Sequence, residues 1–386
     1  MSAIRKVCVV ITARPSYSRI KTAMQAIQNH PGLELQVVLA GSALLDRYGS
    51  IEHTIERDGF EVNEKVYMVL EGENPMAMAK TTGIGLLELS NTLYNLKPDI
   101  VLVIADRFET ISVSIAAAYQ NIPLVHVQGG EITGNIDEKV RHANTKLADI
   151  HFVASESARN RVIRLGEDPE YVFNTGCPSI DLAAGTLASP NLSFDPYKKY
   201  GGVGETPLLN EGYIIVMQHP VTNEYEESRK QIFETLEAAK DLNLPTLWFW
   251  PNVDAGADGI SRGIRQYREK DKIPNIHFFK NMVPEDFLEL LYNSKCLVGN
   301  SSVGIRECSF LGVPTVNIGS RQDGRDRGPN VTDVFYSRIA IKDAINNWLA
   351  AERPVQSHVY GGGDAGKKMA DILDTITLRY HKKINF

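Results

Sequence analysis

The sequence predicts an α/β protein in which each of two halves is built on a parallel sheet covered by helices. The chain has 386 residues, too many for one compact core, so two or three domains are expected. Short apolar runs alternate with longer amphipathic stretches from end to end, which is the pattern of strand–helix–strand units. The run Asp99–Ala105 is almost wholly apolar, as is typical of a central strand covered on both faces. Both halves are therefore expected to be Rossmann-like.

The first half starts with a strand. The apolar run Val7–Thr12 is too short for a signal peptide or a membrane span, so it is expected to be buried. Further along the same half, strands and helices alternate. Strands are predicted at 6–12, 34–40, 99–105, 122–127 and 150–154. Helices are predicted near 16–29, 75–96, 107–119, 137–148 and 156–164.

A change of composition separates the halves. The stretch 183–211 is rich in Gly, Pro, Ser and Asn and has no sustained periodicity, so a linker is predicted there between domains at 1–182 and 212–363. Strands then follow at 213–218, 245–250, 276–280, 295–299 and 314–318. Helices are predicted near 228–241, 258–270, 284–293 and 303–311, and two more close the chain at about 338–351 and 364–380.

The net charge and the cysteines restrict the kinds of ligand and site that are expected. The net charge of −6 leaves no basic surplus, which argues against general binding to nucleic acid or to a membrane surface. An anionic ligand would have to be held by a few placed arginines and backbone amides. The four cysteines lack zinc-site spacing and are expected to be reduced apolar side chains of a cytoplasmic protein: Cys8, Cys177, Cys296 and Cys308. No metal and no cofactor are predicted.

In such a fold, ligand chemistry is expected just after the carboxyl ends of the strands, around a cleft between the two sheets. Arg14 follows the first strand and precedes a helix that Ser16 or Ser18 could cap. The free N–H groups of a helix start favour an anion. The plain alternative is a capped helix with a solvated arginine.

Asp106 comes directly after the strand 99–105. Two interpretations stay open for it. It is either the N-cap of the next helix or a catalytic carboxylate in a cleft, where partial desolvation would raise its pKa toward a value useful for proton transfer.

The strand 122–127 leads into the most informative stretch. Gln128 is followed by paired glycines, which allow close approach of a ligand to the backbone, and then by Glu131. Asp137 and Arg141 share a helix face at their spacing, either as a surface ion pair or as part of a site. The density of polar residues from 128 to 142 indicates a functional site rather than a purely structural role for this stretch.

In the second half, His219 ends a central strand and is expected to face the cleft rather than only to pack. The strand 245–250 likewise ends in a polar loop with Asn252 and Asp254. Both positions match the expected edge of the second sheet.

The strand 295–299 ends in a Gly-Asn-Ser-Ser turn that enters a helix. Ser301 and Ser302 offer hydroxyls, backbone N–H groups and a helix dipole to a diphosphate, although the turn is neither a P-loop nor a GxGxxG motif. Glu307, about a turn and a half into that helix, could accept two ribose hydroxyls. Arg321 follows the strand 314–318 as a second cation for the phosphates.

These stretches resemble the UDP-N-acetylglucosamine 2-epimerase family, and more closely its hydrolysing branch, which feeds the synthesis of sialic-acid-type sugars. The resemblance covers nearly the whole chain, in eight segments in order: YGSIEHTIERDGF, LKPDIVLVIADRFE, GGEITGNIDEKVRHANTKLADIHF, NTGCPSIDL, QHPVT, PNVDAG, VGNSSVGIREC and VNIGSRQDGR. It implies a GT-B-like fold of two Rossmann-like domains, with a C-terminal helix at 364–386 that packs back on the first domain. It also implies a homodimer or homotetramer.

The resemblance also implies roles for individual residues. Asp106, Glu131, Asp137 and His219 match the family's catalytic acids and histidine. Contacts to the nucleotide and sugar are implied for Arg14, Ser301, Ser302, Glu307, Arg321, Phe287, Asn252 and Asp254.

Gln128 departs from the family pattern, because many members carry a glutamate there. A glutamine cannot take a proton. Either Asp106, Glu131 or Asp137 does that work here, or the amide reads an extra polar substituent on a different sugar.

The reaction that the resemblance implies is an anti elimination. A base removes the proton on sugar carbon 2 as UDP leaves carbon 1, and water then adds to the bound 2-acetamidoglucal to give N-acetylmannosamine. The same reaction on UDP-N,N'-diacetylbacillosamine, a non-hydrolysing 2-epimerase, a GT-B glycosyltransferase and a sugar-nucleotide sensor without activity stay as alternatives.

Overall fold

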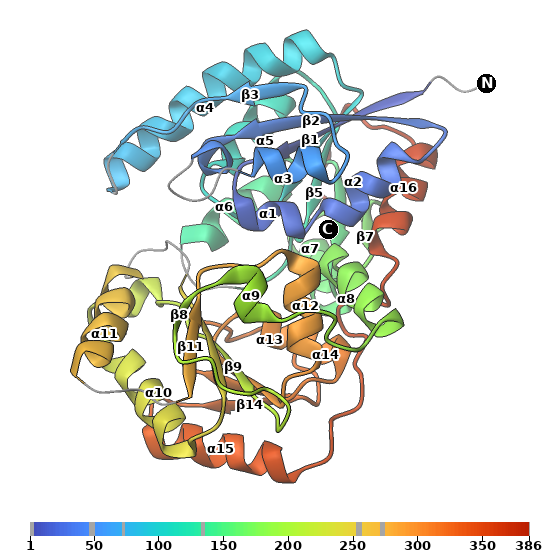
Figure 1. Ribbon diagram of the computed structural model, residues 1–386. Helices are drawn as coiled ribbons and strands as arrows, with labels where there is room; N and C mark the ends of the chain where they lie inside the picture. Colours follow the sequence, from blue (N-terminus) through green and yellow to red (C-terminus); the bar gives the residue numbers. More distant parts are fainter. Residues whose placement is uncertain are drawn as a thin grey trace. The chain divides into compact units, whose positions relative to one another are not determined.

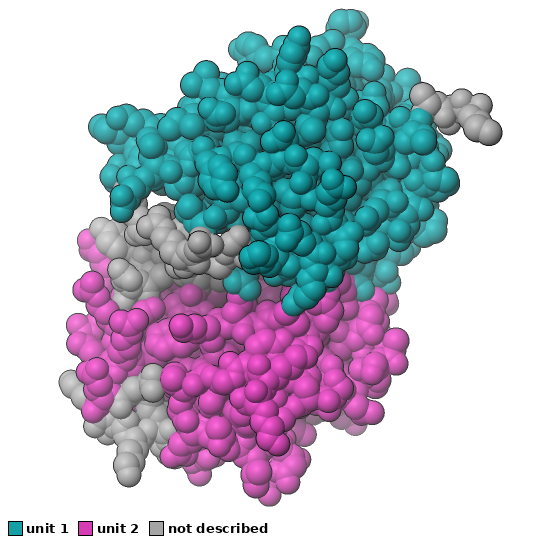
Figure 2. All heavy atoms as spheres, turned by 45° about the horizontal axis from the view of Figure 1, so that its top comes forward, with its two compact units in different colours: residues 1–181, 361–386 teal, residues 182–360 magenta. Residues whose placement is uncertain are grey.

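The computed structural model describes residues 4–45, 51–71, 74–132, 136–251, 257–270 and 275–385. The chain divides into two compact units, residues 1–181 with 361–386 and residues 182–360 (Figure 2). The ribbon in Figure 1 labels most of the helices and several strands of both units.

In the described part of the first unit, seven parallel strands form one sheet in the order β3-β2-β1-β4-β5-β6-β7. The strands are β1 (Arg5–Ile11), β2 (Leu33–Ala40), β3 (Glu64–Val66), β4 (Ile100–Ile104), β5 (Leu124–Val127), β6 (Ile150–Val153) and β7 (Val172–Asn174). The five strands predicted for this half are confirmed to within two residues at each end. The edge strands β3 and β7 escaped prediction because three residues are too few to show a period.

Helices cover both faces of this sheet. They are α1 (Arg14–Ser18), α2 (Lys21–Gln28), α3 (Glu52–Arg57), α4 (Pro75–Leu96), α5 (Thr110–Tyr119), α6 (Ile136–Leu147), α7 (Glu156–Arg164), the start of α8 (Pro178–Ala188) and α16 (Ala365–Thr375). Alternate residues of β1 face opposite cores, with Val7 and Val9 in one cluster and Cys8 and Val10 in the other. This double burial explains why the central strands are apolar throughout.

The helix predicted at 16–29 is wrong in detail, because the chain forms two helices with a break at Ile20. The expected cap by Ser16 or Ser18 is also wrong. α1 begins at Arg14 after Ala13, which provides no side-chain cap, and the Ser18 hydroxyl donates to the carbonyl of Pro15 at 3.1 Å.

The C-terminal helix α16 packs in the first unit, but it ends at Thr375 instead of continuing toward the end of the chain as expected. Met369 and Leu373 belong to the core cluster beneath β1, and α16 lies beside α2 (Figure 1). The Asp181 carboxylate accepts the N–H groups of Ala365 and Gly366 at 2.9 and 2.7 Å, which holds the start of this helix.

In the described part of the second unit, seven strands are ordered β14-β13-β12-β9-β10-β11-β8, all parallel except β8. The strands are β8 (Val203–Gly204), β9 (Ile214–Met217), β10 (Thr246–Phe249), β11 (Ile276–Phe279), β12 (Cys296–Gly299), β13 (Thr315–Ile318) and β14 (Val331–Val334). The helices are α9 (Pro196–Tyr200), α10 (Ser228–Leu242), α11 (Ala257–Lys270), α12 (Pro284–Tyr292), α13 (Ser302–Ile305), α14 (Glu307–Leu311) and α15 (Arg338–Ala350).

Two predictions for this half need correction. The helix expected at 303–311 is two short helices, because the backbone breaks at Arg306 (φ −100°, ψ −74°). The predicted linker 183–211 contains the end of α8, all of α9 and β8. It packs within the second unit, where the ring of Tyr197 stacks on Phe279 at 6.1 Å. Polar composition concealed these short elements.

Among the described residues, no helix combines the length and the apolar character needed to span a bilayer. The four cysteines, all of which are described, are buried and form no disulfide.

Candidate functional site

In the first unit, three predicted residues meet after the carboxyl ends of β4 and β5. The guanidinium of Arg141, from α6, forms an ion pair with the Asp106 carboxylate. It also donates to the backbone carbonyl of Glu131 at 2.7 Å. Because Arg141 is only 1% exposed, its charge is shielded little by water and attracts the Asp106 carboxylate strongly. Arg141 is therefore the organising residue of this cluster.

One of the two interpretations of Asp106, that it is the N-cap of the next helix, is wrong. α5 begins at Thr110 and its N-cap position is Glu109, so Asp106 does not cap that helix. Asp106 instead lies in the turn that follows β4, after Ala105, which adopts the left-handed conformation at φ 60°. The turn directs the carboxylate toward α6 and Arg141.

Gln128 is also buried, at φ 65°, directly after β5. Its amide nitrogen donates to Sγ of Cys177 at 3.1 Å. Its amide oxygen has no hydrogen-bond partner within the described residues. The next turn is held by Arg161, which donates to the carbonyl of Gly130 at 2.9 Å. Gln128, at the position where many members of the resembled family carry a glutamate, is thus a neutral side chain that contacts the Cys177 thiol.

Asp137 lies half-buried in the first turn of α6, where a carboxylate is favoured by the helix dipole. His142, later in the same helix, contacts Glu138 at 3.4 Å. Arg14 is exposed at the start of α1. Asp137 therefore shares an element with Arg141, whereas Arg14 belongs to a separate turn after β1.

The sequence analysis missed two buried polar residues in this region. Thr12, at the end of β1, has a buried hydroxyl without a hydrogen-bond partner in the described part of the unit. Glu109 is buried and pairs with Arg107 at 3.5 Å. A polar group that is buried without full pairing is costly unless a ligand or water completes it. Glu109 could have been noticed as the acid that follows Asp106 in the quoted segment LKPDIVLVIADRFE.

In the second unit, Asn300 joins the ends of two strands. Its side-chain oxygen accepts the backbone N–H of His219 at 2.7 Å, and its side-chain nitrogen donates to the carbonyl of His219 at 2.8 Å. Gln322 and Arg321 donate to the Asn300 carbonyl at 2.8 and 3.3 Å. Three turns, after β9, β12 and β13, are thus fixed by one asparagine that the sequence analysis did not single out.

The turn after β12 requires a glycine before Asn300. Gly299 has φ 132°, and a Cβ at this position would lie 2.1 Å from the carbonyl oxygen of Met217. The close approach of β12 to β9 is what allows Asn300 to reach both main-chain groups of His219.

His219 is neutral in this setting. Burial, with a smaller contribution from the positive charge of Arg321, lowers its pKa to about 3. A neutral imidazole can donate or accept a hydrogen bond near pH 7, but it is not a protonated acid there. To donate a proton to a departing oxygen, His219 would therefore require an anionic ligand that raises this pKa.

The predicted phosphate-binding residues lie beside this turn. Ser301 caps α13, its hydroxyl accepting from the N–H of Val303 at 3.4 Å, and Ser302 is the first residue of that helix. Glu307 begins α14, after the break at Arg306, rather than continuing one longer helix. Phe287, on α12, packs edge-on against Phe249 at the end of β10, with ring centroids 5.2 Å apart. Asn252 and Asp254 lie outside the described residues.

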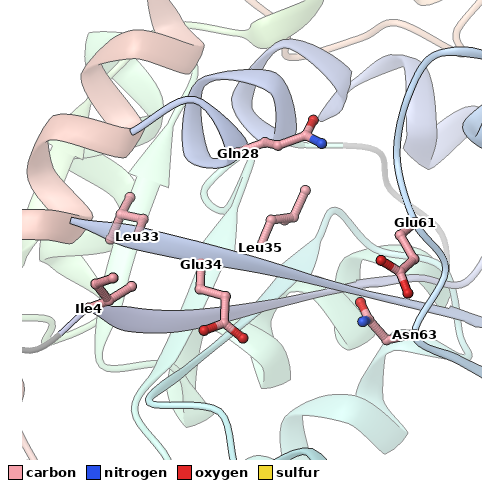
Figure 3. A pocket seen from close by; sticks show the side chains of 7 residues that line it. All are labelled: Ile4, Gln28, Leu33, Glu34, Leu35, Glu61 and Asn63. Atoms are coloured by element: carbon pink, nitrogen blue, oxygen red, sulfur yellow. The ribbon is translucent and has the colours of Figure 1, made fainter. Parts of the chain in front are cut away.

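A separate hollow of about 330 Å³ lies in the first unit, near the amino ends of β1 and β2 (Figure 3). Its lining residues are Ile4, Gln28, Leu33, Glu34, Leu35, Glu61 and Asn63. None of the predicted site residues lines it. Among the described residues, no cluster of three or more His, Cys, Asp or Glu side chains is arranged to hold a metal ion.

Comparison with known proteins places these residues in a family. The family model described as UDP-N-acetylglucosamine 2-epimerase matches residues 25–374. A protein of Legionella pneumophila named UDP-N,N'-diacetylbacillosamine 2-epimerase (hydrolyzing) is 32% identical over 97% of this chain and 97% of its own. A protein of Neisseria meningitidis named UDP-N-acetylglucosamine 2-epimerase is 30% identical over 94% of this chain and 92% of its own.

Solved structures agree in fold. The UDP-GlcNAc 2-epimerase of Neisseria meningitidis bound to UDP-GlcNAc superimposes with a TM-score of 0.78, at 18% identity, over 95% of this chain and 99% of its own. The enzyme of Methanocaldococcus jannaschii in complex with UDP-GlcNAc and UDP gives a TM-score of 0.75, at 16% identity, over 95% and 99% of the two chains. Each sheet with its helices is therefore a Rossmann-like domain of a GT-B-like fold. The family model and the relatives show that the chain belongs to the UDP-N-acetylglucosamine 2-epimerase family.

Proposed function

We propose that the protein is a hydrolysing 2-epimerase that converts UDP-N-acetylglucosamine and water into UDP and N-acetylmannosamine. The observation that carries this proposal is the cluster of Asp106, Glu131 and Arg141 at the strand ends of the first unit, in a chain of this family. The word hydrolyzing in the names of relatives from Legionella pneumophila and Campylobacter jejuni, each 32% identical, supports release of UDP.

In the proposed reaction, a carboxylate removes the proton from carbon 2. The electron pair of that C–H bond becomes the C1=C2 double bond, the C1–O bond breaks, and its electrons leave with UDP. Water then adds its hydroxyl to C1. A proton is delivered to C2 on the face opposite to the one from which the first proton was removed, which inverts the configuration at C2. Asp106, which Arg141 holds in place, suits the role of base, and Glu131 and Asp137 are the further acids for reprotonation.

We propose that the same substrate takes its nucleotide contacts from the second unit. Negative charge builds up on the diphosphate as it leaves, and Arg321, Ser301 and Ser302 would stabilise it without a metal ion. The Glu307 carboxylate would accept hydrogen bonds from the ribose hydroxyls. Neutral His219 would donate a hydrogen bond to a phosphate oxygen. Arg14 is a further candidate cation. A homo-oligomer is also proposed, on the resemblance alone.

A second substrate has specific support. The relatives from Legionella pneumophila and Campylobacter jejuni are named for N,N'-diacetylbacillosamine, which carries a second acetamido group. Gln128 presents a buried amide at the position where many family members have glutamate. An amide can pair with another amide through one donor and one acceptor, so Gln128 suits a sugar with this additional group.

The test is incubation of the protein with each nucleotide sugar in deuterated water, followed by NMR of the products. The proposal predicts free UDP, a sugar with the inverted configuration at C2, and deuterium at C2. A UDP-linked epimer without free UDP would indicate the non-hydrolysing reaction. UDP release only on addition of an acceptor would indicate a glycosyltransferase, and binding without turnover would indicate a sensor.

A further inference from the structure

The buried histidine of β5 has no role in the reaction described above, yet it contacts the turn that carries Asp106. His126 is 0% exposed. Its Nε2 lies 2.9 Å from the carbonyl oxygen of Ala105, and its Nδ1 lies 3.0 Å from the hydroxyl of Thr145. One ring therefore joins β5, the end of β4 and α6, the three elements that hold the acidic cluster.

The chemistry of these partners fixes the tautomer of the ring. Burial lowers the pKa of His126 to about 3, so the imidazole is neutral near pH 7. A carbonyl oxygen only accepts hydrogen bonds, so Nε2 carries the proton. Nδ1 is then an acceptor, and the Thr145 hydroxyl must donate to it. Thr145 thus selects the form of His126 that can hold the Ala105 carbonyl.

The Ala105 peptide needs such a restraint. Its φ of 60° lies in the left-handed region, which is unfavourable for a residue with a side chain. Its N–H donates to the carbonyl of Val127 at 2.9 Å, and its carbonyl is held by His126. Asp106 follows immediately and meets Arg141. The orientation of this peptide therefore decides where the Asp106 carboxylate lies.

One face of α6 supports both contacts. Arg141 and Thr145 are one turn apart, so they share that face, the first pairing with Asp106 and the second with His126. Gly129 leaves room for this arrangement. A Cβ on Gly129 would lie 3.0 Å from both Nδ1 of His126 and the hydroxyl oxygen of Thr145.

We propose that His126, held as its Nε2–H tautomer by Thr145, is a positioning residue that orients Asp106 for proton transfer through the Ala105 carbonyl. Its effect on turnover depends on the proposed function, since Asp106 is the base in that scheme. The tautomer itself depends only on the fold.

The test uses two matched pairs in the full-length protein. Thr145→Val removes the donor at constant shape, and Thr145→Ser keeps it. His126→Leu removes both ring nitrogens, and His126→Gln keeps an amide donor that can reach the Ala105 carbonyl. We expect Thr145→Val and His126→Leu to lower kcat by about ten- to a hundredfold with KM changed less than about threefold, as a misplaced catalytic group does. Thr145→Ser and His126→Gln should recover most of that loss.

A second readout does not need the substrate. In protein labelled with ¹⁵N-histidine, the His126 ring should show the Nε2–H tautomer and should not titrate down to pH 5. Thr145→Val takes the hydrogen-bond donor away from Nδ1 and should shift the ¹⁵N resonance of that atom, and Thr145→Ser should keep the wild-type resonance. An Nδ1–H tautomer in the wild type, or equal kcat values for Thr145→Val and Thr145→Ser, would overturn the proposal. If neither nucleotide sugar is turned over, the proposed function fails while the tautomer result still decides this inference.

Discussion

The two units fix their polar turns in different ways. In the first unit, side chains contact other side chains and backbone carbonyls. Arg141 forms an ion pair with Asp106, and both ring nitrogens of His126 form hydrogen bonds, one to the Ala105 carbonyl and one to the Thr145 hydroxyl. In the second unit, the Asn300 side chain forms hydrogen bonds with the backbone N–H and carbonyl of His219. Gln322, in the turn after β13, donates to the Asn300 carbonyl. Substitutions in the first unit should therefore change proton transfer, and those in the second should change nucleotide binding.

The largest expected effect follows replacement of Asp106. Asp106→Asn removes the proposed base and its ion pair with Arg141 and should lower kcat by about a thousandfold, within the range for general acid–base groups. UDP affinity, measured by titration calorimetry, should stay within about threefold of the wild type. Asp99→Asn, at the exposed opposite end of the same strand, is the control and should leave kcat unchanged. Near-normal turnover by Asp106→Asn would remove Asp106 from the chemistry.

The second unit should respond in the opposite sense. Arg321→Ala should weaken UDP binding by about ten- to a hundredfold, because a charge-assisted hydrogen bond contributes roughly 1.5–3 kcal/mol. Arg338, which pairs with Asp241 at 2.6 Å at the start of α15, provides the control substitution Arg338→Ala. Calorimetry should show little change for the control. An unchanged UDP affinity in Arg321→Ala would place the diphosphate elsewhere.

A third variant tests the support behind the first unit. Lys382, in the C-terminal tail, pairs with buried Glu167 at 2.6 Å and donates to the carbonyls of Thr145, Lys146 and Ala148 at the end of α6. Lys382→Met should lower the free energy of unfolding by about 1–3 kcal/mol, the lower values reflecting partial exposure of the ammonium. Chemical denaturation measures the change. The control Lys367→Met, at an exposed position of α16, removes only a surface pair with Asp371 and should cost under about 1 kcal/mol.

The smallest expected effect concerns pH. Burial lowers the pKa of both His126 and His219 from 6.5 to about 3, so below pH 6.5 the unfolded chain binds protons that the folded chain does not. The free energy of unfolding should therefore fall as the pH falls from about 6.5 toward 3. Between pH 7 and 5.5 the loss should be about 1 kcal/mol for each histidine. In His219→Gln, denaturation curves should show a smaller loss; an identical pH dependence would show that His219 does not stay neutral.

Glu167 acts in a lower pH window. Burial alone would raise its pKa, but hydrogen bonds from His151, Lys146 and Lys382 outweigh it and lower the pKa to about 2. Its stabilising contribution is present above pH 4.5 and is lost as the pH falls toward 2. The loss between pH 7 and 5.5 therefore reports on the histidines and not on this carboxylate.

The central strands and long helices could be predicted from sequence because burial on both faces leaves an uninterrupted apolar run, as in β4. The helix α4 was predicted at its exact bounds, and its Asn74 cap accepts from the N–H of Ala77. Short edge strands such as β3 and the helix break at Arg306 leave no periodic signal. In the site, charged residues after strands were found, but Asn300 and His126 were not. Their roles depend on hydrogen bonds to distant backbone groups, which no local pattern encodes.

The central claim is a division of labour, with proton chemistry in the first unit and nucleotide binding in the second. A crystal structure of the protein with UDP and 2-acetamidoglucal tests it most directly. We predict a diphosphate bound by Arg321, Ser301 and Ser302, and a sugar whose C2 lies within reach of the Asp106 carboxylate. A diphosphate bound to other residues, or a sugar C2 remote from Asp106, Glu131 and Asp137, would contradict the account.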